Sequence, residues 1–232
     1  MDDFIIYDGM LDGYIGLDRQ IKIPNGVHTI CDEAFMCNSY LTSIDGSEDL
    51  CMIGGYAFAN CERLEKITLP DSVMCIGDHA FEGCRALKEF DVPLGVTEIY
   101  ENTFEDCGKL ENIKLHDGII TIEKNAFCGC SKIKELVVPR GVTEICESAF
   151  CGMTGLEKIT LHDEITEIGE NAFFGCVKLK EIFIPKSVEM VGMGAFSFCK
   201  CTIYCEAEKI PKGWDQSWSL GNCVVVLGSK RS

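Results

Sequence analysis

The stretch Asn171–Cys199, NAFFGCVKLKEIFIPKSVEMVGMGAFSFC, contains the pair Ala-Phe twice, and each phenylalanine is followed three residues later by a cysteine. The phenylalanine recurs eight times at an unbroken spacing of 23 residues, at Phe35, Phe58, Phe81, Phe104, Phe127, Phe150, Phe173 and Phe196. A period this strict, without insertions, is typical of a solenoid in which identical supersecondary units stack. The repeat therefore predicts a single elongated domain.

Three other positions keep the same period. The residue before each phenylalanine is alanine in seven units and Thr103 in the eighth. The position three residues after it is cysteine in six units, with Asn38 and Met153 in the other two, and leucine or isoleucine stands six residues after it in the first seven. Because stacked units share one interior, these positions predict continuous columns of buried side chains.

One unit, CERLEKITLPDSVMCIGDHAFEG (Cys61–Gly83), shows how a coil is built. Leu64–Leu69 ends in apolar–polar alternation, which predicts a short strand, and Pro70 favours a turn directly after it. Val73 and Ile76 predict a second short extended segment. The following Ala-Phe is expected to form a single helical or 3₁₀ turn that places its ring in the interior.

The pattern Leu-x-x-Ile-x-Leu-Pro-x-x-Val-x-x-Ile-Gly-x-x-Ala-Phe-x-x-Cys resembles the BspA-like class of leucine-rich repeats, over roughly Ile21 to Cys199. His116 and His162 depart from it by replacing the proline, without breaking the period. The predicted fold class is an α/β-type repeat solenoid: a right-handed leucine-rich-repeat coil with a parallel β-sheet on its concave face, mostly strands and turns with short helical turns. The resemblance also implies protein recognition, including adhesion of microbes to host surfaces.

The flanks of the repeats are expected to cap the solenoid, because a bare end exposes both core and unpaired strand groups. We predict a hairpin-like N-terminal cap over 1–20, a solenoid of about eight repeats over 21–200, and a C-terminal cap over 201–232. Asp8-Gly9 favours the hairpin turn. Trp214 and Trp218 are expected to cover the last coil, with Val224–Leu227 as a final strand.

Composition excludes several classes of partner. The formal net charge of −16 repels nucleic acid and anionic lipid, whose binding depends on basic patches. No stretch is long and apolar enough to span a membrane, so we expect no membrane insertion. The start MDDFIIYDGM lacks the basic region of a signal peptide. These features favour a cytoplasmic protein; a cell-surface or secreted protein is the alternative if the sequence has been trimmed.

The 16 cysteines are predicted to be reduced and structural. Six of them occupy one column, where the strand spacing of about 4.8 Å exceeds the Cβ separation of about 3.8 Å that a disulfide prefers. The four histidines are too far apart to share a zinc ion, and no cysteine stands apart from the repeat as a nucleophile should. We therefore predict no catalytic residues, no metal site, no cofactor and no enzymatic activity.

Two sets of outward positions lie on the predicted strands. One set alternates in charge, as in Glu65-Lys66 followed by Lys88-Glu89, and predicts a ladder of ion pairs between coils. The other lies between two inward residues, so it faces outward. It begins polar and ends apolar, and its candidate partner-binding residues are Asp45, Thr68, Asp91, Lys114, Val137, Thr160, Phe183 and Tyr204.

Together these features predict a non-enzymatic module that binds a protein through the strand face, most simply as a monomer. Three alternatives remain at this stage: an adhesin that contacts host proteins, an enzyme with a thiol or metal site, and a structural spacer with no partner.

Overall fold

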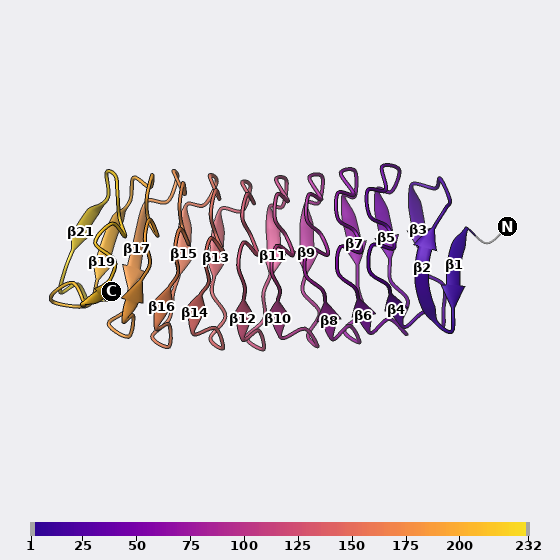
Figure 1. Cartoon of the computed structure of the whole chain (residues 1–232), viewed down its shortest axis with the longest axis horizontal. Helices are drawn as coiled ribbons and strands as arrows, with labels where there is room; N and C mark the ends of the chain where they lie inside the picture. The colour runs from indigo at the N-terminus through magenta and orange to yellow at the C-terminus, as the bar shows by residue number, and fades with distance from the viewer. Residues whose placement is uncertain (1–2, 231–232) are drawn as a thin grey trace.

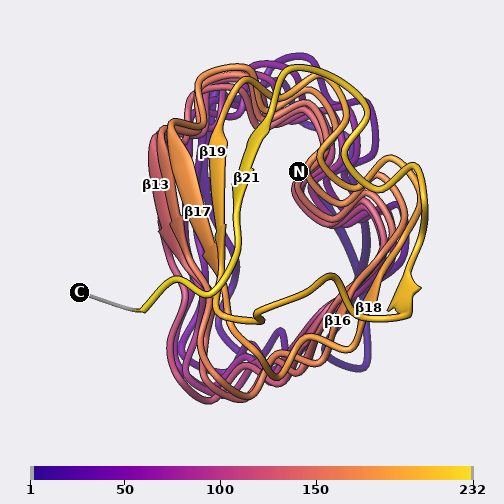
Figure 2. The same cartoon turned by 90° about the vertical axis from the view of Figure 1, so that its left-hand side faces the viewer.

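The computed structural model describes residues 3–230 as one stack of coils, which Figure 1 shows in a nearly straight row. Residues 1–2 of the predicted N-terminal cap and 231–232 of the predicted C-terminal cap lie outside the described residues. Viewed end-on, each coil is a loop, and successive loops lie over one another with longer strands on one side and short strands on the other (Figure 2). The predicted parallel-strand solenoid is confirmed.

Strands of three or four residues line one side, and their outward surface is called the long-strand face below. Their inward residues, such as Ile67, are buried, while the residues on either side point outward. The strands are β3 (Gln20–Lys22), β5 (Ser43–Asp45), β7 (Lys66–Thr68), β9 (Glu89–Asp91), β11 (Asn112–Lys114), β13 (Glu135–Val137), β15 (Lys158–Thr160), β17 (Glu181–Ile184), β19 (Thr202–Cys205) and β21 (Val224–Val226).

Two-residue strands line the opposite side and also pair in parallel from coil to coil. They are β4 (Thr29–Ile30), β6 (Met52–Ile53), β8 (Cys75–Ile76), β10 (Glu98–Ile99), β12 (Thr121–Ile122), β14 (Glu144–Ile145), β16 (Glu167–Ile168), β18 (Met190–Val191) and β20 (Gly213–Trp214). Each ends in a buried apolar residue, so both sides of every coil contribute to one core.

The Ala-Phe segment forms isolated hydrogen-bonded turns rather than the short helical turns predicted from sequence. Residues 3–230 contain no α-helix or 3₁₀-helix, and so no helix that could cross a membrane. The cause is local: the residue two before the phenylalanine has a positive φ, as in His79 (58°), and so has the residue two after it, as in Gly83 (66°). Left-handed residues on both sides stop helical dihedrals from continuing.

The eight repeated phenylalanines form the centre of the core. Seven of them are fully buried and Phe35 nearly so, and neighbouring rings stack with centroids 5.0 to 5.9 Å apart. Backbone hydrogen bonds hold the coils at this spacing; for example, the Phe81 N–H donates to the Thr103 carbonyl at 3.0 Å. The predicted phenylalanine column therefore is one continuous stack.

The cysteine column has a polar role that the sequence did not reveal. The thiol of each of its six cysteines donates to the carbonyl of the phenylalanine one coil back, as from Cys107 to Phe81 at 3.2 Å. Burial raises the pKa of Cys61 to about 12 and those of Cys84 and Cys107 well above the ordinary value. These thiols are neutral donors that satisfy buried carbonyls.

The two ends of the stack are closed differently. At the N-terminus, β1 (Phe4–Tyr7) and β2 (Met10–Tyr14) form an antiparallel hairpin that turns at Asp8-Gly9, and β2 pairs in parallel with β4. At the C-terminus, β19 and β20 add a further coil to both rows, and β21 pairs with β19. Trp218 packs edge-on against Phe196 at 5.7 Å. The segment after Cys199 thus extends the stack before it closes it.

Candidate functional site

The candidate partner-binding residues lie in one row on the long-strand face. Strand pairing places them on neighbouring rungs: Asp45 beside Thr68, Asp91 beside Lys114, Val137 beside Thr160, and Phe183 beside Tyr204. The same register begins with Lys22 and ends with Val226. We call this row the central column. It brings together all eight residues that the sequence pointed to.

The N-terminal half of the central column is polar and internally neutralised. Lys114 Nζ lies 2.6 Å from Asp91 Oδ2, and this contact raises the pKa of Lys114. The two residues line an open hollow of about 540 Å³ together with Thr68 and the outward residues of neighbouring strands. Since Asp91 and Lys114 pair with each other, these two residues offer little unsatisfied charge to a partner.

The C-terminal half of the central column is apolar. Val137 is 67% exposed, and Thr160, Phe183 and Tyr204 are half-buried on the following rungs. The last three line a second hollow of about 440 Å³, which Lys158, Glu181 and Lys230 border. Phe183 is thus less exposed than an outward strand position suggests, because Tyr204 stands beside it on the next rung.

Val226 extends the central column, and Lys230 borders the second hollow. Neither was among the predicted binding residues. Val226 is the rung after Tyr204 and is 38% exposed. The repeat period shortens here: Ile182 pairs with Ile203 after 21 residues, and Ile203 pairs with Val225 after 22. A search at a fixed period of 23 therefore stops one coil early. The strand predicted over Val224–Leu227 is confirmed as β21 (Val224–Val226), but Val226 was not assigned to the central column.

Ion pairs flank the central column as the sequence predicted. Lys88 bonds to Glu65 on the preceding coil, Lys66 lies 3.2 Å from Glu89, and Lys180 Nζ lies 2.6 Å from Glu157 Oε2. The hydrogen bond from Lys88 lowers the pKa of Glu65. All these side chains are more than a third exposed, so each pair contributes little to stability and mainly fixes strand register.

The Glu65–Lys88 pair gives a pH-dependent prediction. Because the folded-state pKa of Glu65 is lowered, its stabilising effect is present above the unfolded-state pKa of about 4.3 and is lost as the pH falls through the folded-state pKa. Glu65→Gln should slightly lower the urea midpoint at pH 7, and the difference from wild type should shrink as the pH falls below about 4.3 and vanish once Glu65 is protonated in the folded state. Equilibrium unfolding across this pH range measures both effects.

Glu111→Gln is the matched control for this prediction. Glu111 occupies the same column as Glu65, on the other side of Lys88, whose ammonium group bonds to Glu65. If Glu111→Gln shifted the midpoint as much as Glu65→Gln, or if the Glu65→Gln effect persisted at low pH, the ion pair would not be its cause.

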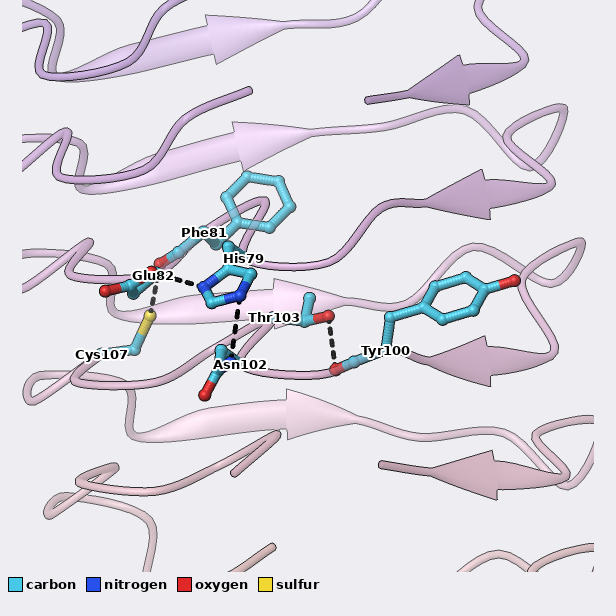
Figure 3. A network of polar contacts seen from close by, with 7 residues as sticks. All are labelled: His79, Phe81, Glu82, Tyr100, Asn102, Thr103 and Cys107. Atoms are coloured by element: carbon cyan, nitrogen blue, oxygen red, sulfur yellow. Dashed lines mark hydrogen bonds and ion pairs between the residues drawn. The ribbon is translucent and has the colours of Figure 1, made fainter. Parts of the chain in front are cut away.

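The histidines take part in hydrogen bonds within the scaffold. Figure 3 shows His79 between two neighbours: its Nδ1 lies 2.7 Å from Glu82 Oε2, and its Nε2 lies 3.1 Å from Asn102 Nδ2. Thr103, which replaces the usual alanine, donates from Oγ1 to the Tyr100 carbonyl at 2.8 Å. Both ring nitrogens of His79 are engaged, so neither is available as a metal ligand.

Two further histidines, which replace the turn proline of their repeats, bond back to the preceding coil. His116 Nε2 donates to the Pro93 carbonyl at 3.0 Å, and His162 Nε2 donates to the Pro139 carbonyl at 2.8 Å. His162 is only 7% exposed, so its ring is packed within the turn rather than lying on the surface. Among residues 3–230, no three His, Cys, Asp or Glu side chains are grouped as metal ligands.

Comparison with known proteins agrees with this architecture. A family model described as the BspA type leucine rich repeat region matches the chain in six copies, over residues 17–134 and 97–210. No curated protein matches the chain significantly.

Several solved structures are similar to the chain, and three of them are described here. The leucine-rich repeat protein of T. pallidum (TpLRR) is 27% identical with a TM-score of 0.70, over 73% of this chain and 82% of its own. A leucine-rich cell surface protein from Faecalibacterium prausnitzii is 30% identical with a TM-score of 0.60, over 90% of this chain but only 54% of its own. A leucine-rich repeat protein from Eubacterium ventriosum, 20% identical with a TM-score of 0.57, covers 87% of this chain and 67% of its own, and shows the fold alone.

The family match covers most of the chain and includes the same columns of Leu, Ile, Ala, Phe and Cys that build the core. The chain belongs to the BspA-type leucine-rich repeat family.

Proposed function

We propose that the protein is a non-enzymatic binding module that holds a protein partner against the C-terminal half of the long-strand face. The observation that carries the proposal is the row of Val137, Phe183, Tyr204 and Val226, interrupted only by Thr160, on an otherwise polar, ion-paired sheet. An outward apolar side chain on such a sheet stays in contact with water until a partner covers it. A row of them supports a contact surface.

Rigidity also favours this role. Parallel pairing fixes Phe183 and Tyr204 on adjacent rungs, and the rungs themselves rest on the stacked phenylalanine core. A partner would therefore meet side chains that lose little further freedom on binding. The net charge of −16 favours a protein partner over nucleic acid.

The double variant Val137→Asp/Phe183→Asp tests this surface. Two carboxylates in the apolar row would have to be desolvated on binding, so capture of partner from the source cell's lysate should fall at least about tenfold. Quantitative mass spectrometry of the captured proteins measures the loss, and light scattering on the same samples checks the proposed monomeric state. Circular dichroism confirms that the variant is folded.

Met74→Asp/Ile120→Asp is the matched control. Met74 and Ile120 are 70% and 53% exposed. They directly precede the short strands β8 and β12 on the opposite side of the stack. This variant makes the same change of charge away from the long-strand face and should retain the partner. Equal loss in both variants, or retention in both, would reject the long-strand face as the binding surface.

A second candidate is a cell-surface protein that contacts host proteins. The observation that favours it is the 30% identity to a protein described as a cell surface protein. The 16 cysteines, all free in the structure, instead favour a reducing compartment such as the cytoplasm. Treating intact cells with a membrane-impermeant maleimide separates the two, because Cys37 and Cys51 are exposed and will be labelled only on a surface protein.

A further inference from the structure

Cys128 and Cys151 stand outside the buried cysteine column. Each directly follows a core phenylalanine, Phe127 or Phe150, and the two are 23 residues apart, so they occupy the same position on consecutive coils. Both are partly exposed, whereas the column cysteines on the same coils, such as Cys130, are fully buried. They are therefore paired thiols that solvent can reach.

The backbone places the two cysteines on adjacent rungs. The Asp106 N–H donates to the Cys128 carbonyl at 2.8 Å, and the Gly129 N–H donates to the Cys151 carbonyl at 2.9 Å. Coils joined in this way lie about 4.8 Å apart, within the Cα separation of roughly 4.4–6.8 Å that a disulfide spans. Closing the bond requires the two Cβ atoms to move about 1 Å toward each other, because a disulfide prefers a Cβ separation of about 3.8 Å. Each cysteine is followed by a glycine with positive φ, Gly129 or Gly152, so only a hydrogen, not a side chain, flanks it on that side.

The two thiols also interact with each other. The hydrogen bond from the Cys128 thiol lowers the pKa of Cys151 to about 7, and the same bond raises the pKa of Cys128. The nearby carboxylate of Glu105 opposes ionisation of both thiols, and that of Asp106 opposes ionisation of Cys128. By contrast, burial raises the pKa of Cys146, another partly exposed thiol on the later coil, to about 11.

We propose that Cys128 and Cys151 form a reactive dithiol that closes to a disulfide when it meets a small-molecule disulfide such as oxidised glutathione. The Cys151 thiolate attacks one sulfur of glutathione disulfide and releases one glutathione thiolate, which takes up a proton. Cys128 then loses its proton, attacks the Cys151 sulfur and releases the second glutathione. The protein loses two electrons and two protons, and glutathione disulfide gains them.

This modification site lies off the long-strand face, since neither cysteine belongs to a long strand. Closing it links two coils in the middle of the stack and leaves the central column untouched. The inference is thus independent of the proposed function, and either can fail alone.

Peptide mapping of the full-length protein tests the pairing. The reduced protein is exposed to glutathione disulfide, its remaining thiols are blocked with N-ethylmaleimide, and it is digested with trypsin. Fragment spectra should join the peptide of residues 125–132, through Cys128, to that of residues 141–158, through Cys151. A link through Cys130 or Cys146 instead, or no link while other thiols form mixed disulfides, overturns the proposal.

Single variants establish the order of events. In Cys128→Ser, Cys151 should accumulate as the mixed disulfide with glutathione because its resolving thiol is gone. In Cys151→Ser, Cys128 should stay largely unmodified, and Cys146→Ser, the matched control, should form the linked peptides as wild type does. Accumulation on Cys128 rather than Cys151 would contradict the assigned roles.

Alkylation kinetics provide a readout that does not require a variant to fold. At pH 7.5 in the native wild-type protein, iodoacetamide should modify Cys151 roughly 20- to 60-fold faster than Cys146, because the larger thiolate fraction of Cys151 outweighs the lower nucleophilicity of its thiolate. Equal rates for the two would show that the dithiol is not activated and would overturn the proposal.

Discussion

Replacing Phe127 with alanine should lower the free energy of unfolding by about 3–5 kcal/mol. Phe127 is fully buried in the middle of the stack, with Phe104 5.5 Å away on one side and Phe150 5.9 Å away on the other. The substitution removes two ring contacts at once and leaves a cavity that the neighbours cannot fill, because backbone hydrogen bonds fix the spacing of the coils.

Urea unfolding followed by circular dichroism measures this effect, with Phe198→Ala as the control. Phe198 is also an aromatic residue within a repeat, but it is 66% exposed and contacts only the edge of Phe174 among the aromatic rings of the described residues. Its replacement should cost less than about 1 kcal/mol. A loss below about 1 kcal/mol for Phe127→Ala, or equal losses for both variants, would show that the phenylalanine stack does not carry the stability of the coil.

A damaged central coil should also weaken the coupling between the two halves of the stack. Each coil is stabilised only by its immediate neighbours, so one weak interface can separate the unfolding of the N-terminal coils from that of the C-terminal coils. Trp214 and Trp218, both in the C-terminal segment, report on one half by fluorescence, while circular dichroism reports on the whole. Transitions that coincide in wild type should separate in Phe127→Ala.

The coil architecture could be predicted from sequence because every unit repeats the same pattern of buried and exposed positions. A single run such as Leu64–Leu69 is ambiguous alone, but eight copies in register leave one consistent arrangement of inward and outward positions. The predicted row from Asp45 to Tyr204 follows directly from that register, since a constant period places equivalent residues on adjacent rungs.

Features that depend on neighbouring coils were not predictable in the same way. The left-handed conformations at Tyr56 and His79 could not be predicted, because these residues are not glycines. The turn that brings each Ala-Phe into the core imposes them. The thiol-to-carbonyl bonds of the cysteine column pair residues 26 positions apart, so no local pattern indicates them. Val226 was missed for a related reason, because its coil is shorter than the period that defines the others.

Thiol titration should divide the cysteines into two classes of very different reactivity. Eight of the 16 are buried: Cys61, Cys84, Cys107, Cys130, Cys176, Cys199, Cys201 and Cys205. A thiol with a pKa of about 12, such as Cys61, has on the order of one thiolate in ten thousand at pH 8, and its coil also shields it from the reagent. The buried eight should therefore react at least about 1,000-fold more slowly than the exposed Cys37.

Ellman's reagent makes the comparison on one sample. In the native protein at most eight thiols should react promptly, since 16 minus eight buried leaves eight. Cys37→Ser should remove one from the fast class, and denaturation in guanidinium chloride without reductant should release all 16. Prompt reaction of more than eight native thiols would mean that the column thiols are not held against the phenylalanine carbonyls. Fewer than 16 after denaturation would mean that some cysteines are already oxidised, and a reducing compartment would no longer follow from their number.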